Sequence, residues 1–197
     1  MAERLGRHPF RELAAWMDEA RAVQPFWADA MVLATTDESG APAARAVLLR
    51  GLDERGLVFY TDGESRKGRE LARDPRAALV FLWPSHERQV RVEGVVQPVG
   101  EEEVDAYWAG RPRGSQLSAW ASHQSEVVSG RDVLEKAVAE LSERFGDGPV
   151  PRPPRWAGFR LVPSAFEFWQ GRPDRLHDRL RYRLDGRGQW LTERLAP

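Results

Sequence analysis

A Ser-Arg-Lys tripeptide in the first half of the chain could bind a phosphate group. Ser65, Arg66 and Lys67 open a predicted helix that runs to Arg73, and they follow directly on a predicted strand that ends at Thr61. The first turn of a helix has free backbone N–H groups, and a hydroxyl and two cations beside them suit an anion. The same pattern is typical of a capped surface helix with solvated basic residues, and the local residues alone favour that alternative.

Two arginines lie on an apolar strand predicted from Ala43 to Arg50. Arg45 and Arg50 would face opposite sides of a regular strand, because successive side chains alternate between its two faces. Such a strand could serve two different anions. The pattern is also typical of a core strand whose two arginines face water near its ends. The local residues alone favour this alternative.

The strand predicted over residues 89–96 alternates polar and apolar side chains. Gln89, Arg91 and Glu93 share one face, and valines occupy the other. A polar face is usually exposed to solvent. A glutamine inside a pocket would instead offer both a donor and an acceptor to the edge of a bound ring.

A second candidate phosphate site lies near the middle of the chain. Tyr107 and Arg111 are four residues apart at the end of a predicted helix, and therefore share one face of it. Pro112 ends that helix, so residues 113–115, which finish at Ser115, must turn back. A phenol, a guanidinium and a hydroxyl could hold a phosphate. The alternative is a helix C-terminus with cations near the negative end of its dipole.

The segment from Phe168 to Arg179 is the most informative in the chain. If its last five residues are extended, Arg175, His177 and Arg179 share one face. Like charges placed together repel each other unless an anion or an electron-rich ring lies against them, so a functional role is favoured here. Trp169 could supply an aromatic wall nearby, or it could belong to the core.

Composition excludes several classes of function. The 197 residues include 29 Lys and Arg against 30 Asp and Glu, so we expect no binding to nucleic acid. The chain has no Cys, and its four His lack the spacing of metal ligands, so we expect no metal. No apolar run approaches the roughly 20 residues that span a bilayer, and the N-terminus lacks the apolar core of a signal peptide. We therefore expect a cytoplasmic protein without membrane contacts.

Short strands must position most of these residues. An amphipathic helix is expected after Pro9, within an N-terminal segment of residues 1–24. Further helices are expected over residues 65–73, 101–109 and 131–145, and strands over residues 30–36, 43–50, 57–61, 77–83, 89–96, 158–162, 165–170, 179–184 and 190–194. Closely spaced strands indicate a Greek-key or meander antiparallel barrel with flanking helices, an α+β and mainly β fold in a single domain of residues 1–197.

The ordered motifs of the chain resemble the pyridoxamine 5'-phosphate oxidase family from about residue 25 to the end. The motifs are RAVLLR, YT with SRK, RQVRVEG, YWAGRPRGSQLSAWASHQS, FWQG, RLHDR and the terminal RLAP. Each motif is weak alone. Their shared order and family-like spacing make the resemblance specific.

The resemblance implies an FMN-binding split β-barrel that forms a homodimer, with FMN in a cleft at the subunit interface. Residues 155–197 would serve dimerisation and substrate binding. The implied FMN contacts, with Arg66 and Lys67 on the phosphate, are Arg45, Ala46, Val47, Leu48, Leu49, Arg50, Tyr60, Thr61, Arg66, Lys67, Gln89, Gln124, Ser125, Trp169 and Arg179. The implied substrate contacts are Arg50, Tyr107, Arg111 and Ser115 on the phosphate, with Arg175 and His177, the implied catalytic pair, over the pyridine ring.

The resemblance also implies a reaction. Pyridoxamine 5'-phosphate or pyridoxine 5'-phosphate would be oxidised by O2 to pyridoxal 5'-phosphate, with release of hydrogen peroxide and, from the amine, ammonia. Arg179 would stabilise the reduced flavin at its N1 and O2 edge. One departure concerns Arg50, which stands where the family usually has Lys and has a different reach and hydrogen-bond geometry.

Two alternatives remain open at this stage. One is a related split-barrel flavoprotein, such as a flavin reductase or a flavin-binding stress protein, that acts on another substrate. Tyr107, Arg111, Ser115 and the RLHDR motif argue against it, because they belong to the substrate half of the resemblance. The other is a non-catalytic protein that stores or delivers FMN or pyridoxal phosphate.

Overall fold

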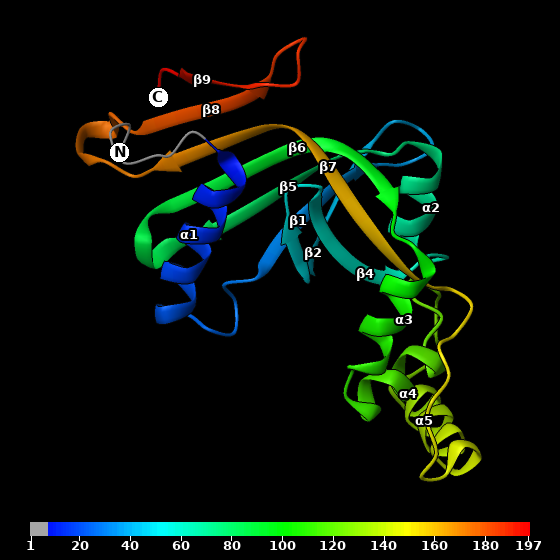
Figure 1. The fold of residues 1–197 in the computed structure, drawn as a ribbon. Helices are drawn as coiled ribbons and strands as arrows, with labels where there is room; N and C mark the ends of the chain where they lie inside the picture. Colours follow the sequence, from blue (N-terminus) through cyan, green and yellow to red (C-terminus); the bar gives the residue numbers. More distant parts are fainter. Residues whose placement is uncertain (1–7) are drawn as a thin grey trace.

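A strongly curled antiparallel sheet forms the centre of the molecule, and helices lie around its edges (Figure 1). The computed structural model describes residues 8–197. The helices are α1 (Pro9–Val23), α2 (Arg66–Arg73), α3 (Glu101–Ala109), α4 (Arg113–Ala121) and α5 (Arg131–Phe145), with short 3-10 turns η1 (Pro84–His86) and η2 (Pro173–Arg175). The strands are β1 (Ala30–Thr36), β2 (Pro42–Leu48), β3 (Gly51–Asp53), β4 (Gly56–Asp62), β5 (Arg76–Trp83), β6 (Arg88–Pro98), β7 (Trp156–Gln170), β8 (Asp178–Leu184) and β9 (Trp190–Arg194).

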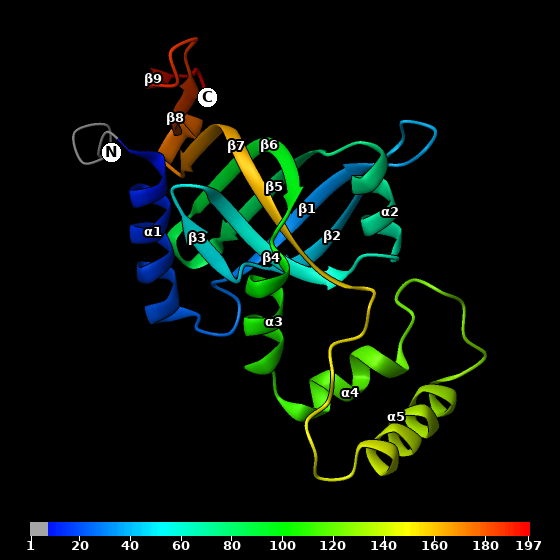
Figure 2. The same cartoon turned by 45° about the vertical axis from the view of Figure 1, so that its right-hand side comes forward.

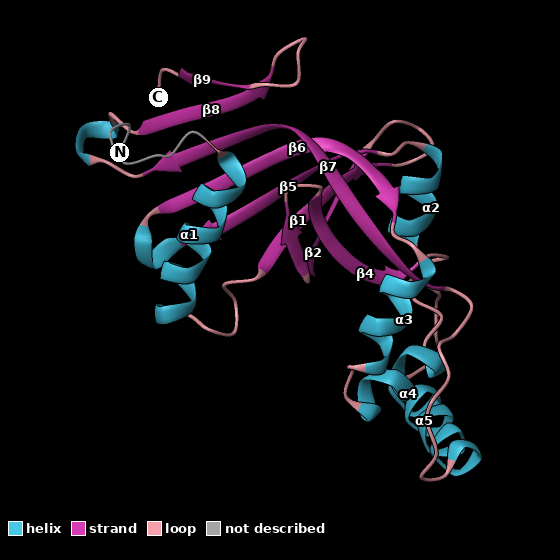
Figure 3. Cartoon of the chain, viewed as in Figure 1, coloured by secondary structure: helices cyan, strands magenta, loops and turns pink. Residues whose placement is uncertain are grey.

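The strands join into one nine-stranded sheet with the order β2-β1-β5-β6-β7-β4-β3. Strand β8 pairs with β7, and β9 pairs with β8, so a hairpin extends the sheet beyond β7 (Figure 3). All pairs are antiparallel. The mainly β split-barrel prediction is confirmed by this curled sheet with its flanking helices.

Strand β7 is the longest element of the sheet, and it connects two regions. Its first half pairs with β4 and its second half with β8, while β6 runs beside nearly all of it. The sequence predicted two strands here, residues 158–162 and 165–170. The break that suggested two strands is a bulge, where Gly94 pairs with Pro163 and Glu93 with Ala165. The residue left without a partner on β6 is Ser164, and proline is tolerated beside it because the hydrogen-bond ladder is locally disrupted at a bulge.

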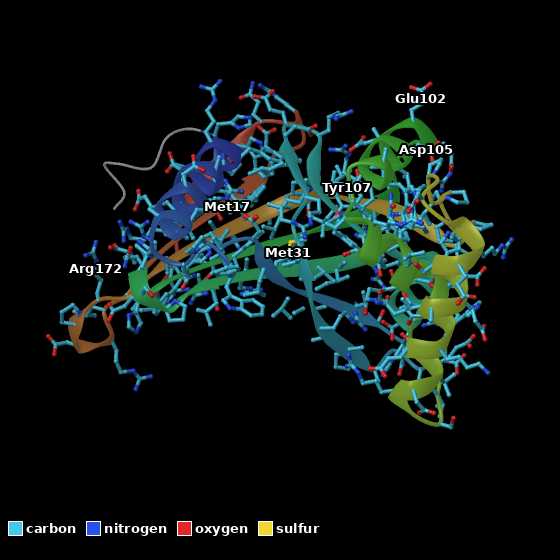
Figure 4. The ribbon with its side chains drawn as sticks, turned by 90° about the horizontal axis from the view of Figure 1, so that it is seen from below. Met17, Met31, Glu102, Asp105, Tyr107 and Arg172 are labelled. Atoms are coloured by element: carbon cyan, nitrogen blue, oxygen red, sulfur yellow. The ribbon has the colours of Figure 1, made fainter. Side chains whose placement is uncertain are left out.

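The main core lies between α1 and the concave side of the sheet. Leu13, Met17 and Ala20 of α1 are at most 1% exposed, and they pack in one apolar cluster with sheet residues such as Met31. Met17 and Met31 both lie in the central part of the molecule (Figure 4). Apolar residues at three- and four-residue spacing therefore face the core, as the sequence predicted.

A second, smaller cluster holds the helices beyond the sheet. Val104 and Trp108 of α3 pack with Leu117 of α4 and with Trp156 at the start of β7. Helices α3, α4 and α5 extend away from the sheet (Figure 2). The expected helices α2, α3 and α5 are confirmed, with the same first or neighbouring residues.

Helix α4 was not predicted. Residues 113–115 were expected to turn back after Pro112, but they form the first turn of α4 instead. Helix α3 ends at Ala109, and Pro112 is the N-cap residue of α4, so only residues 110–112 separate the two helices. The missing N–H of Pro112 costs nothing at a helix start, where no acceptor is available inside the helix.

No helix in residues 8–197 combines the length and the apolar character needed to cross a membrane. Over the same residues, no three His, Asp or Glu side chains are grouped as metal ligands.

Candidate functional site

Lys67 is the centre of a buried polar cluster at the start of α2. The hydroxyl of Ser65 caps this helix by accepting from the N–H of Gly68. The Lys67 Nζ donates to Gln124 Oε1 at 2.6 Å and to Thr61 Oγ1 at 3.1 Å, and the residue is only 8% exposed. These partners are neutral, and within residues 8–197 no carboxylate makes an ion pair with the ammonium.

The electrostatic surroundings of Lys67 disfavour its charge. Burial lowers the pKa of Lys67, and the nearby Arg45 guanidinium lowers it further, while Asp62 and Glu70 act in the opposite direction. An anion bound beside the ammonium would reverse this shift. The cluster is therefore suited to a ligand with negative charge.

Arg66 and Ser125 lie beside this cluster. The backbone N–H of Arg66 donates to Ser125 Oγ at 3.2 Å, so the loop after α4 touches the first turn of α2. Ser125 has a positive φ of 78°, which is uncommon for a residue other than glycine. The sequence had placed Arg66, Lys67, Gln124 and Ser125 in one cofactor site, and the structure brings these four together.

A cavity of about 360 Å³ opens next to the cluster. Residues from β4, α4, the loops around them and the start of β7 line it, among them Tyr60, Thr61, Arg111, Ser115, Gln124 and Trp156. The cavity thus joins residues from the predicted cofactor set with residues from the predicted substrate set.

Aromatic rings surround Arg111 at one side of this cavity. Its Cζ lies 4.3 Å from the centre of the Trp156 ring and 5.9 Å from that of Tyr107, and Tyr107 stacks on Tyr60 at 3.8 Å. An Arg111 Nη donates weakly to the carbonyl of Ser115 at 3.4 Å. The Nε of Arg111 and the Nε1 of Trp156 are buried without an acceptor among the described residues. Both residues line the cavity, and their unpaired donors would need a small shift of the side chains to reach a ligand with acceptor atoms.

A buried ion pair holds the wall of the cavity. Arg155 Nε donates to Asp62 Oδ2 at 2.8 Å, and the two side chains are 9% and 8% exposed. The Arg155 Nη2 also donates to the carbonyls of Ala119, Trp120 and Ser122 at the end of α4. Arg155 therefore ties the loop that carries Gln124 to strand β4.

Arg45 lies on β2 behind the α2 cluster. Its Nη2 donates to Glu70 Oε2 at 2.7 Å, and its Nη1 to Thr35 Oγ1 at 2.5 Å. Arg66 Nε donates to the other oxygen of the same Glu70 carboxylate at 2.8 Å. The sequence had predicted the two arginines but not the carboxylate between them.

A second group of predicted residues gathers at the far end of β7. Gln89 of β6 and Arg179 of β8 are the cross-strand partners of Trp169. The His177 ring lies 4.7 Å from the Trp169 ring. Arg179 Nε donates to Glu167 at 2.9 Å, and this carboxylate raises the pKa of Arg179.

The prediction of an extended segment from Arg175 to Arg179 was wrong. Arg175 ends the turn η2 with a positive φ of 61°, and strand β8 begins only at Asp178. Arg172 closes this turn, because its N–H donates to His177 Nδ1 and its side chain pairs with Asp178. The sequence predicted that the like charges of Arg175, His177 and Arg179 need a bound anion or an electron-rich ring against them. This prediction also fails for Arg179, because the Glu167 carboxylate of the same chain forms an ion pair with it.

Arg50 does not join either group. Strand β2 ends at Leu48, so Arg45 and Arg50 do not lie on one regular strand, and the proposal of two faces was wrong. The N–H of Arg50 instead donates to the carbonyl of Val58, and its side chain lines a separate hollow beside Arg21 of α1. Of the four residues before it, 46–49, Leu49 is buried in the main core and Leu48 is 39% exposed.

The two groups lie at opposite ends of the molecule. In Figure 4, Arg172 of the turn before β8 lies at one end of the molecule, and Tyr107 of α3 lies beyond the centre, toward the other end. The ribbon shows the same separation between α3–α4 and the β7–β8 turn (Figure 1). A single chain therefore does not bring all the predicted residues into one site.

Asp62, Glu70, Arg155 and Trp156 were missed by the sequence reasoning. Asp62 and Glu70 flank the Ser-Arg-Lys motif at distances of three residues, so their place beside the motif was a signal that could have identified them. Arg155 and Trp156 are distant in sequence, and only the pairing of β4 with β7 brings them to the cavity.

Comparison with known proteins identifies the family. Residues 19–145 match the family described as pyridoxamine 5'-phosphate oxidase, and residues 156–197 match the region described as the pyridoxine 5'-phosphate oxidase C-terminal dimerisation region. The chain belongs to the pyridoxamine 5'-phosphate oxidase family. Among its relatives, a pyridoxine/pyridoxamine 5'-phosphate oxidase of Ralstonia pickettii is 56% identical over 189 residues, which are 96% of this chain and 89% of that protein.

Solved structures show the same fold. PhzG from Burkholderia lata, in complex with tetrahydrophenazine-1-carboxylic acid, superposes with a TM-score of 0.91 at 35% identity, over 99% of this chain and 95% of that one. A pyridoxamine 5'-phosphate oxidase-related, FMN binding protein from Nostoc punctiforme superposes with a TM-score of 0.77 at 21% identity, over 96% of this chain and 98% of that one. The split barrel is thus common to this family member and to both neighbours.

Proposed function

We propose that this family member is an FMN-dependent oxidase that converts pyridoxamine 5'-phosphate or pyridoxine 5'-phosphate to pyridoxal 5'-phosphate, with O2 as the electron acceptor. The names of the relatives at 54–56% identity support this substrate class. The observation that carries the proposal is the buried ammonium of Lys67, which has only neutral partners in its cluster and adjoins a cavity lined by Arg111 and Ser115.

The residues around Lys67 fit the phosphate of FMN. The ammonium, the hydroxyl of Thr61 and the first turn of α2 offer donors from three directions. Arg66, which is 59% exposed in its side chain, adds a second cation. Bound FMN would supply the redox chemistry, accepting a hydride from the substrate carbon and passing electrons to O2, which becomes H2O2.

The remaining residues would hold and orient the substrate. Arg111 and Ser115, with Tyr107 beside them, would bind its phosphate, because the Arg111 Nε has no acceptor among the described residues. Arg175 and His177 would cover the pyridine ring on the side away from the cofactor. Arg50 lies outside the cavity of the same chain, so its predicted role in phosphate binding depends on the second subunit.

The active form would be a homodimer in which each site takes residues from both chains. The two groups of predicted residues lie at opposite ends of one chain, and the second group lies within the region that matches a dimerisation region. A second copy, placed by a twofold axis, would bring the β7–β8 end of one chain to the α2–α4 end of its partner.

The likeness to PhzG favours a second candidate function. Arg111, which lines the cavity, could bind the carboxylate of a reduced tricyclic ring instead of a phosphate, since both anions accept from a guanidinium. This candidate predicts oxidation of a dihydro- or tetrahydrophenazine carboxylate and no turnover of the phosphorylated pyridines.

The test is a turnover assay with the purified protein and FMN. Pyridoxamine 5'-phosphate, pyridoxine 5'-phosphate and a tetrahydrophenazine carboxylate would each be added in air, while the aldehyde product, oxygen consumption and peroxide are followed. Replacing Arg175 and His177 together with Ala should abolish turnover but leave the fold intact. Arg187→Ala, in the exposed turn between β8 and β9, is the matched control for a lost arginine.

Three outcomes separate the candidates. Pyridoxal 5'-phosphate and peroxide in equal amounts would support the proposed oxidase. Turnover of the phenazine alone would replace it with the second candidate. FMN binding without turnover of any of the three would mean a split-barrel flavoprotein with another substrate or a non-catalytic binder, and no FMN binding would refute the proposal.

A further inference from the structure

Glu70 connects the two arginines that lie nearest to the proposed phosphate site. One oxygen of its carboxylate accepts from Arg45 Nη2 at 2.7 Å and from Thr35 Oγ1 at 2.5 Å. The other oxygen accepts from Arg66 Nε at 2.8 Å. The three donors come from β2, β1 and α2, so the carboxylate is a junction between the helix and two strands.

The hydrogen bonds to Glu70 determine which nitrogen atoms of each guanidinium are already occupied and which remain for a ligand. Arg66 is fixed through Nε, and its Nη2 lies 3.7 Å from Asp37, beyond hydrogen-bond distance. Arg45 is fixed through both of its Nη atoms, by Glu70 and by the hydroxyl of Thr35. Among the described residues, the terminal Nη edge of Arg66 therefore makes only this longer ion pair with Asp37, which a phosphate could replace. Most of the Arg66 side chain is exposed, and without Glu70 it would be mobile.

The charge on Glu70 is secure. Burial raises the pKa of Glu70, but the hydrogen bonds from Thr35, Arg66 and Arg45 lower it more, and the net shift is downward. The carboxylate is 5% exposed in its side chain, so it has little surface of its own to offer to a ligand. A buried carboxylate is costly, and its three charge-assisted or short hydrogen bonds offset that cost.

Three cations, Arg45, Arg66 and Lys67, surround this one carboxylate. The Arg45 guanidinium is close enough to Lys67 to affect its titration, so the cations repel each other. Without Glu70, the two arginines would move apart and adopt several rotamers. Binding a phosphate would then have to order them again, at a cost in side-chain entropy.

We propose that Glu70 is a positioning residue for the cofactor phosphate, holding the guanidinium of Arg66 in the orientation that binds it, while Arg45 fixes the Glu70 carboxylate from the other side. Glu70 itself does not touch the ligand. The inference rests on the proposed function, because it takes FMN as the ligand of the α2 cluster.

The test compares two flavins that differ only in the phosphate. FMN and riboflavin would be titrated into the apoprotein of the wild type and of Glu70→Gln, and binding followed by flavin fluorescence. The Gln side chain keeps the shape, but its amide N–H₂ would face a guanidinium donor. We expect FMN affinity to fall by about ten- to a hundred-fold, by analogy with the loss found when a group that orients a metal ligand is removed, with riboflavin affinity unchanged.

A control and a double variant make the result specific. Glu140→Gln removes the same charge from the exposed face of α5 and should leave the affinity for both flavins unchanged. In an Arg66→Ala background, Glu70→Gln should cause a smaller further loss than it does alone, because Glu70 acts partly through Arg66.

Thr35→Val is the second variant, in case Glu70→Gln does not fold. It keeps the β-branched shape of the strand but removes one donor to Glu70 and one acceptor for Arg45, so a smaller loss of FMN affinity is expected. Equal losses for FMN and riboflavin would overturn the inference, because Glu70 would then only stabilise the fold. Tighter FMN binding would overturn it too, because the carboxylate would then only weaken the local positive potential.

The inference and the proposed function can fail separately. A wild type that binds FMN, with a Glu70→Gln variant of the same FMN affinity, would overturn the inference alone. A wild type that binds neither flavin would overturn the proposed function and this inference with it.

Discussion

The ion pair between Arg155 and Asp62 should be among the most important polar contacts for stability. Replacing Arg155 with Met keeps most of the apolar stem but removes the guanidinium. Asp62 would remain 8% exposed in its side chain without its cation, and three carbonyls at the end of α4 would lose a donor. The carboxylate would keep only the N–H of Glu64 among these partners.

The structure allows an estimate of the loss. Removing one partner of a buried ion pair costs about 3–5 kcal/mol, because the other charge stays buried and unpaired. Some of the carbonyls could recover water, so we expect the lower part of this range. Arg131→Met is the matched control, because Arg131 is 88% exposed in its side chain and its pair with Glu135 should contribute less than about 1 kcal/mol.

The assay is urea unfolding at one fixed protein concentration, followed by the fluorescence of the tryptophans. The expected result is a lower midpoint for Arg155→Met with an unchanged slope, which means a loss of stability at constant exposed surface. Amide hydrogen exchange should also become faster in the loop that carries Gln124 and Ser125.

A loss below about 1 kcal/mol for Arg155→Met, similar to that of the control, would refute this reasoning. It would mean that the pair is hydrated in solution and that the α4 loop is held by other contacts. A large loss of stability without faster exchange near Gln124 would keep the energetic argument but refute the role of Arg155 in holding that loop.

Three further predictions follow from local geometry. Gly68→Ala should destabilise the protein by about 1–3 kcal/mol in urea unfolding, because a Cβ there would lie 2.1 Å from the carbonyl oxygen of Gly63, whereas Gly114→Ala, in open space in α4, should be neutral or stabilising. FMN binding at about pH 9 should take up protons in the wild type, because the pKa of Lys67 is lowered in the free protein and a bound phosphate raises it again. The Lys67→Met variant should show no such uptake. Calorimetry in two buffers of different ionisation enthalpy measures the number of protons taken up. Mixing inactive Lys67→Met and His177→Ala subunits should restore about one quarter of wild-type activity, because half of the dimers are mixed and each has one intact site; no recovery would contradict a shared site.

Regular patterns in the sequence predicted most of the fold. The period of apolar residues in α1 and the alternation in β6 place Leu13 and Val92 in the core, where both are 0% exposed. The sequence could not predict that Pro112 joins two helices, or that a bulge at Gly94 carries β7 past Pro163 as one strand. A proline is compatible with a helix start as well as with a helix end, and with a bulge as well as with a strand end, so the local residues could not decide between these alternatives.

The candidate site was predicted in part because its motifs are short and local. The tripeptide from Ser65 to Lys67 contains its own helix cap and its own cations, so its place at the start of a helix could be predicted without a fold. The shape of the turn around Arg175 could not, because it depends on the contact of Arg172 with His177 and Asp178. Glu70 and Arg155 were missed because a buried carboxylate and a buried guanidinium look like surface charges until their burial is known.

The length of β7 is the physical reason that the two groups of predicted residues lie far apart within one chain. Trp156, at its first residue, lines the cavity with Arg111, and Trp169, near its last, lies against His177. The thirteen steps between the two tryptophans amount to roughly 40 Å of extended strand, at about 3.3 Å per residue. Curling of the sheet shortens this span, but the two ends still lie at opposite sides of the molecule. If residues from both ends act on one substrate, they must come from two chains, which is why recovery of activity in mixed dimers is the sharpest test of the shared site.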